Sequence, residues 1–123
     1  MRVARFALSV MAQTRPADVI PSVKAHGARF QARLDAARGR QEGVPAGFEA
    51  AAAVFRKAGM RFWEAVVQLE YAEWLIDQGR PQDAASPLSE ARSIFEELKA
   101  RPSLERLERA AAAMVSAGAL APT

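Results

Sequence analysis

Residues 39–61, GRQEGVPAGFEAAAAVFRKAGMR, and residues 79–101, GRPQDAASPLSEARSIFEELKAR, carry one pattern at a distance of forty positions. The polar positions differ between the two copies, whereas the small and apolar positions correspond: Gly39 and Gly79, Val44 and Ala84, Phe48 and Leu88, Ala51 and Ala91, Val54 and Ile94, Phe55 and Phe95. Corresponding positions spaced three or four residues apart predict the same buried face of an α-helix in each copy.

The recurrence continues in the segment before each of these helices, where Ala25 corresponds to Ala65 and Ala32 corresponds to Ala72 and Ala112. Helices approach one another to about 8–10 Å only where the facing side chains are short. A single helical hairpin cannot bury its apolar stripe, so two similar hairpins stack. The sequence therefore predicts an all-α fold of stacked antiparallel hairpins.

Clusters of glycine and proline separate the helical segments. Pro16 and Pro21 are expected to bracket a break, and Pro87 falls inside a helical pattern. Either Pro87 lies in the first turn of a helix that starts near Ala85 or Ser86, or it kinks a longer helix. The predicted helices are about 3–13, 21–38, 45–58, 62–78, 82–99 and 102–116.

Length and composition restrict the function classes. A chain of 123 residues, half of them hydrophobic, fits one folded domain. It has no cysteine and a single histidine, His26, so we expect no disulfide, no thiolate nucleophile, no metal site and no cofactor. No stretch has the roughly 20 apolar residues of a membrane span, so we expect a cytoplasmic protein that does not enter the membrane.

Charge is distributed unevenly along the chain. Residues 1–61 have 11 Lys/Arg and 4 Asp/Glu, whereas residues 62–123 have 6 and 10. A basic half can contact nucleic acid or acidic lipid. Because the basic residues lie at helical spacing rather than in a run, we expect them to face the acidic half of a neighbouring repeat or chain instead.

The small and apolar positions resemble the tetratricopeptide repeat pattern, with Ala72, Leu75, Gly79, Ala84, Leu88 and Ala91 in one copy and Ala32, Gly39, Val44, Phe48 and Ala51 in the other. The junctions at 53–63 and 91–106 are similar to an elongated variety found near the C-termini of bacterial LuxR-type and SARP-type transcription regulators and of nucleotide-cyclase-linked ATPases. The likeness covers roughly residues 22–110, and it implies a short right-handed superhelix over 1–117, with repeats at about 21–60 and 61–100 and half-repeats at each end. Residues 118–123 are expected to form a disordered tail, as chain ends often do.

Tetratricopeptide proteins usually bind partners on the concave face, which the first helix of each pair lines. The resemblance selects His26, Arg29, Phe30, Arg33, Val66, Leu69, Glu70, Glu73, Ile76, Asp77, Arg106, Arg109 and Ala113. These positions alternate basic, acidic and basic from one helix to the next. One interpretation is a charged groove for an extended peptide or a partner helix. The other is that the opposite charges pair with one another and need no ligand.

Other conspicuous residues have structural explanations. Trp74 lies in an amphipathic stripe and is expected in the core, and Phe62 and Trp63 are expected to pack back on the preceding turn. The neighbouring glutamates at 96–97 and at 105 and 108 are expected to be solvated helix faces, because no nucleophile accompanies them. The sequence contains no recognisable catalytic constellation, so we do not expect an enzyme.

Residues 3–13 match the second helix of a pair whose first helix is missing, and no polar cap precedes them. Uncovered apolar residues favour association. We therefore expect a symmetric homodimer, or a piece of a longer protein, in which the contact is made by Val3, Phe6, Leu8, Val10 and Met11.

We therefore expect this chain to be a protein-interaction, scaffold or regulatory module of a bacterial signalling or transcription system. Two alternatives remain. One is an accessory domain that binds nucleic acid through the basic half, and the other is a small-ligand sensor with a pocket between 21–38 and 62–78. The identity of the partner is not encoded in any motif.

Overall fold

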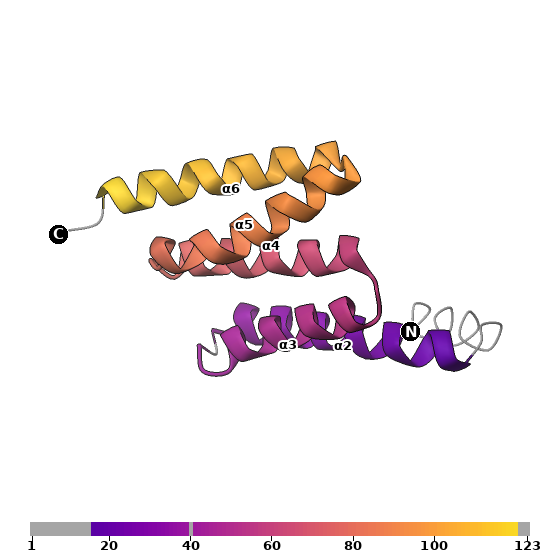
Figure 1. Ribbon diagram of the computed structural model, residues 1–123. Helices are drawn as coiled ribbons and strands as arrows, with labels where there is room; N and C mark the ends of the chain where they lie inside the picture. The colour runs from indigo at the N-terminus through magenta and orange to yellow at the C-terminus, as the bar shows by residue number, and fades with distance from the viewer. Residues whose placement is uncertain (1–15, 40, 121–123) are drawn as a thin grey trace.

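The computed structural model describes residues 16–39 and 41–120. Within those ranges every regular element is a helix: α2 (Pro16–Ala37), α3 (Val44–Lys57), α4 (Arg61–Asp77), α5 (Pro81–Leu98) and α6 (Arg101–Leu120). Figure 1 shows α2 and α3 as one antiparallel hairpin, α4 and α5 as the next, and α6 lying along the second. The predicted all-α fold of packed hairpins is confirmed, whereas the right-handed superhelix stays a prediction.

The helix boundaries differ from the predicted ones mainly at the two ends. The break expected between Pro16 and Pro21 is wrong, because α2 already begins at Pro16. Pro21 follows within the second turn, so its missing N–H removes only one intrahelical hydrogen bond. At the other end α6 runs to Leu120, so residues 118–120 are helical rather than disordered. The predicted helix 3–13 and residues 121–123 lie outside the described residues.

Pro87 lies inside α5, which begins at Pro81, so the alternative that placed Pro87 in the first turn is wrong. Pro81 takes the first helical position, where a missing N–H costs nothing.

None of the helices in the described ranges is long and apolar enough to cross a membrane.

The turns that close the helices share one backbone conformation at a twenty-residue interval. Gly39, Gly59, Gly79 and Lys99 all have positive φ, with values of 74°, 74°, 73° and 55°. After α4 the Arg80 N–H donates to Leu75 O at 2.9 Å and the Gly79 N–H donates to Ile76 O at 3.0 Å. These two bonds satisfy carbonyls at the helix end, as in a Schellman motif. The same pairs of bonds close α3 and α5, so one turn geometry sets the reversals after α3, α4 and α5.

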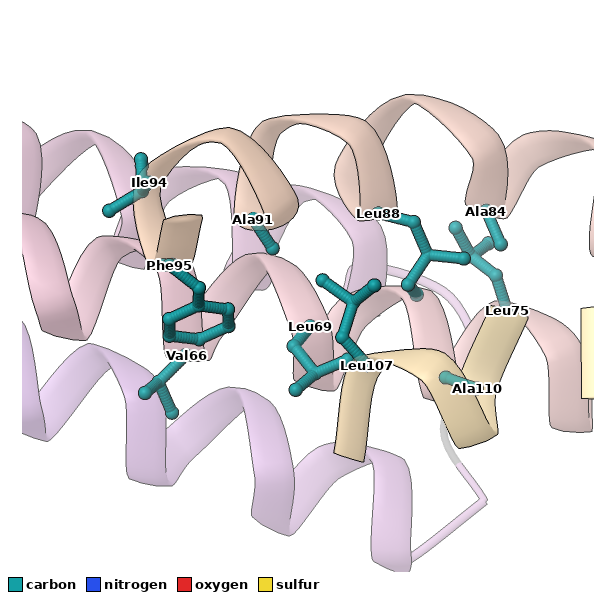
Figure 2. Close-up of a cluster of buried hydrophobic side chains, with 12 residues drawn as sticks. Val66, Leu69, Leu75, Ala84, Leu88, Ala91, Ile94, Phe95, Leu107 and Ala110 are labelled. Atoms are coloured by element: carbon teal, nitrogen blue, oxygen red, sulfur yellow. The ribbon is translucent and has the colours of Figure 1, made fainter. Parts of the chain in front are cut away.

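The core consists of two clusters that meet at α4. One cluster joins α2 and α3 to Val67, and it includes Phe48 and Phe55. The other joins α4, α5 and α6 around Leu69, Phe95 and Leu107, and Figure 2 shows these side chains converging between the three helices. The side chains that pack against both clusters are Trp63, Tyr71 and Trp74. The prediction that Trp74 belongs to the core is confirmed in part, because Trp74 packs against both clusters but is only partly buried.

α4 is the central helix, and its buried polar side chains each reach a different neighbour. Glu64 accepts a hydrogen bond from Arg56 of α3 at 2.8 Å, and Gln68 donates to Glu90 of α5 at 2.7 Å. Glu70 accepts two from α2. Buried polar groups are tolerated only when they are bonded in this way, so these contacts fix the orientation of the neighbouring helices around α4.

The turn geometry predicts opposite effects for one substitution at two glycines. Gly79→Ala should lower the free energy of unfolding by about 1 kcal/mol, because φ of +73° is strained for alanine. Gly27→Ala should raise it by about 0.5–1 kcal/mol, because Gly27 is helical and an added Cβ meets nothing within 4 Å. Urea unfolding followed by circular dichroism measures both. Equal effects of the same sign at the two positions would contradict the turn assignment.

Candidate functional site

The residues selected on the first helices of the hairpins form a row of ion pairs across α2, α4 and α6. Arg29 of α2 donates from Nε to Glu70 Oε1 at 2.7 Å and from Nη2 to Glu70 Oε2 at 2.9 Å. Arg33 approaches the same carboxylate at 3.4 Å. The side chains of Arg29 and Glu70 are only 12% and 8% exposed. This bidentate pair therefore lies in a partly desolvated position, where charge-assisted hydrogen bonds are strong.

The row continues from α4 to α6, where α4 again supplies the carboxylate and α6 supplies the arginine. Arg106 donates to the two carboxylate oxygens of Glu73 at 2.9 and 2.5 Å. Hydrogen bonding to Glu73, opposed by partial burial, raises the pKa of Arg106. We call these five side chains the charge ladder: Arg29, Arg33, Glu70, Glu73 and Arg106. The interpretation that the alternating charges pair with one another is thus confirmed for these residues.

Aromatic side chains support the α2 end of the ladder. The Arg29 guanidinium lies 5.3 Å from the Trp63 ring centre, within the range of a cation–π contact. His26 packs edge-on against Phe55 and Trp63, with ring centres 4.9 and 4.8 Å away. Burial, and secondarily the charge of Arg29, lower the pKa of His26. His26 is consequently a packing residue between two hairpins, and its surroundings favour the uncharged imidazole.

Two of the selected residues lie in the hydrophobic core rather than on a binding face. Val66 is 8% exposed and Leu69 is 1% exposed, and both belong to the cluster shared by α4, α5 and α6. Their assignment to the partner-binding face was wrong because α4 is covered on several sides. A helix that several others cover has no continuous exposed face. Positions of α4 that would line a groove in a less covered helix are therefore buried.

Apart from Glu70, the remaining selected residues of α4 and α6 do come together around a hollow. This hollow, which we call the α4–α6 groove, has a volume of about 400 Å³ and is lined by Glu73, Ile76, Asp77, Arg106, Arg109, Ala110 and Ala113. Ile76 and the two alanines contribute apolar atoms, and the rim carries both signs of charge. Asp77 and Arg109 form no ion pair with any residue in the described part of the chain. They are therefore available to an external group.

Two other hollows lie among α3, α4 and α5. One, of about 410 Å³, is lined by Arg56, Arg61, Glu64, Glu90, Ser93 and Ile94. The other, of about 340 Å³, is lined by Glu49, Arg56, Gln68, Tyr71, Asp83, Ser86, Pro87 and Glu90. Their charged groups are largely engaged with one another, since Arg56 reaches both Glu64 and Glu90. Neither hollow involves α2, where the sensor alternative placed its pocket.

Among the residues of 16–39 and 41–120, no three His, Asp or Glu side chains gather closely enough to hold a metal ion.

Phe30, selected for the partner-binding face, is 58% exposed on α2 and lies outside the α4–α6 groove. Ala110 lines the groove but was not predicted from the sequence. It could have been, because Ala110 lies one turn after the selected Arg106 and therefore on the same face of α6. The residues proposed for self-association, Val3, Phe6, Leu8, Val10 and Met11, lie outside the described residues.

No family model, no curated protein and no solved structure matches this chain.

The position of His26 predicts a specific pH dependence of stability. A pKa below the ordinary value of 6.5 means that the unfolded chain binds a proton more readily than the folded chain. The free energy of unfolding should therefore fall as the pH is lowered through 6.5 towards 5.5, before most carboxylates titrate. His26→Phe, which keeps the ring contacts and removes the titration, should flatten this part of the profile in urea unfolding. An unchanged pH slope in that variant would contradict the assignment.

Proposed function

We propose that this chain is a tetratricopeptide-like interaction module that binds a protein segment in the α4–α6 groove. The observation that carries the proposal is the pair of free charges, Asp77 and Arg109, beside an apolar floor formed by Ile76, Ala110 and Ala113. Small ligand sites and peptide grooves combine apolar area with a few well-placed polar groups in this manner. No catalytic role is invoked, because the groove holds no nucleophile.

The charge ladder restricts where a partner can bind. Breaking the Arg29–Glu70 pair to contact a ligand would leave a buried charge without its partner, which costs several kcal/mol (about 3–5). Arg106 is similarly occupied by Glu73. A partner therefore gains most by contacting the free Arg109 and Asp77. A segment with a carboxylate for Arg109, a cationic or donor group for Asp77 and a small apolar side chain between them fits this surface.

The nucleic-acid alternative receives less support from the same contacts. The basic residues Arg29, Arg56 and Arg61 each pair with a carboxylate of the chain itself, on Glu70, Glu64 and Glu97 respectively. Binding to phosphates depends on cations that can replace counterions, and paired arginines must first be released. A setting in transcription regulation or signalling therefore rests on the resemblance of the repeats alone.

A peptide-display selection on the full-length chain tests the groove. Synthetic peptides made from the selected sequences should bind in fluorescence anisotropy, and Arg109→Glu or Ile76→Asp should weaken them by about ten-fold or more, the scale of a lost charged or apolar anchor. Lys57→Glu, a matched charge reversal at an exposed residue of α3 outside the groove, should leave the affinity unchanged. Replacing the peptide carboxylate by lysine should restore binding to Arg109→Glu. Failure to enrich any peptide, or binding that ignores both groove variants, would refute the proposal.

A further inference from the structure

A second surface, separate from the α4–α6 groove, lies on the outer face of α2. Its large apolar side chains are unusually exposed: Val23 is 46%, Phe30 is 58% and Leu34 is 42% exposed. Together with Gly27 they follow the spacing i, i+4, i+7 and i+11, which places them on one side of the helix. The opposite side, with Ala25 and Ala32, is buried against α3. We call Val23, Gly27, Phe30 and Leu34 the α2 stripe.

The forty-residue recurrence identifies what kind of element covers such a face. On α4 the positions equivalent to Val23, Gly27 and Leu34 are Trp63, Val67 and Trp74, and these pack against the preceding α2–α3 hairpin. The Phe55 and Trp63 rings stack at 6.3 Å in that contact.

The equivalent positions of α6 behave in the same manner. Leu107 and Met114 correspond to Val67 and Trp74, and they pack into the cluster that α5 shares with α4. Each first helix thus uses this face to receive the second helix of the preceding hairpin. Only in α2 is the face uncovered by described residues, so the repeat geometry specifies an α-helix as its occupant.

The residues that precede α2 in the sequence, 1–15, carry Arg2, Arg5 and Arg15 and no acidic side chain. They therefore lack the charge that would complement the basic residues around the α2 stripe.

The charges around the stripe indicate the chemistry of the occupant. Lys24 on α2 and Arg38, which directly follows α2, are exposed near the stripe, and neither has an ion-pair partner among the residues of 16–39 and 41–120. Arg33 is exposed there as well, but it already approaches Glu70. Asp35 is the one acidic residue between Val23 and Gly39. A second copy of the same face would bring these basic residues against each other, which is unfavourable. An acidic helix would complement them.

We propose that the α2 stripe docks an acidic amphipathic α-helix of a partner protein, in the position that a preceding second helix occupies in the other hairpins. The chain itself contains a template for this partner. α5 presents Ala84, Leu88, Ala91 and Phe95 to its first helices and has a net charge of −3, from Asp83, Glu90, Glu96 and Glu97 against Arg92. The equivalent helix α3 has a similar apolar face, but a net charge of +1.

The two helices supply matched probes. Synthetic peptides with capped ends and the sequences of Pro81–Leu98 and Val44–Lys57 are titrated with the full-length chain in fluorescence anisotropy. The acidic peptide should bind about ten-fold or more tightly than the basic one, and the difference should shrink as salt is raised. Phe30→Asp and, independently, Leu34→Glu should each reduce binding of the acidic peptide by about ten-fold. Val115→Asp, at a side chain that is 66% exposed on α6, should have no effect.

Circular dichroism of each variant establishes that it folds before binding is compared. Equal binding of both peptides, tighter binding of the basic one, or binding that survives Phe30→Asp and Leu34→Glu would overturn the proposal. Sedimentation velocity tests whether a second copy of the chain binds the α2 stripe instead. A dimer that Phe30→Asp converts to monomer would assign the stripe to that second copy and overturn the proposal. None of these results depends on Asp77 or Arg109, so the proposal fails or succeeds separately from the α4–α6 groove.

Discussion

The bidentate pair between Arg29 and Glu70 is the most strongly oriented of the contacts that join the two hairpins on the first-helix side, beside those of Arg33 with Glu70 and of His26 with Trp63. It brings a guanidinium from α2 and a carboxylate from α4 together where both are almost out of water, and Trp63 covers the guanidinium from one side. Such a pair is oriented in a way that apolar packing between alanines is not, so it fixes the register of α2 against α4. It also removes these charges from the set that a partner can use. The proposed use of Asp77 and Arg109 in the α4–α6 groove follows from what the ladder leaves unpaired in the described part of the chain.

Much of the fold was predictable because its constraints are local. Gly59 and Gly79 mark turns that need positive φ, and Pro45 and Pro81 mark helix starts, so α3, α4 and α5 were placed within one residue of their observed bounds. The twenty-residue interval of the turns was missed because Lys99 occupies the place of a glycine. The start of α2 was missed because a proline in the second turn weakens a helix without ending it.

The sequence predicted the positions of site residues correctly where they form ion pairs between helices, and incorrectly where their exposure depends on how the helices pack. Opposite charges on adjacent first helices indicated the ladder correctly. Val66 and Leu69 were misplaced because burial of α4 depends on the approach of α5 and α6, which the pattern within α4 does not encode. The α2 stripe was not predicted from the sequence, where only Phe30 among its residues was selected, for the partner-binding face. Its spacing is typical of a buried helix face, whereas the fold leaves it exposed. That disagreement between pattern and burial motivates the search for a partner helix.

A double-mutant cycle on Arg29 and Glu70 tests the central claim, that this pair holds the two hairpins together. Arg29→Met and Glu70→Met are compared singly and together by urea unfolding, beside Arg61→Met and Glu97→Met at an ion pair whose side chains are 52% and 59% exposed. Each single change at the buried pair should cost about 3 kcal/mol, and the double variant should lose at least about 1 kcal/mol less than the sum. The exposed pair should couple by less than about 1 kcal/mol. Additive losses at Arg29 and Glu70, within about 0.5 kcal/mol, would contradict the account.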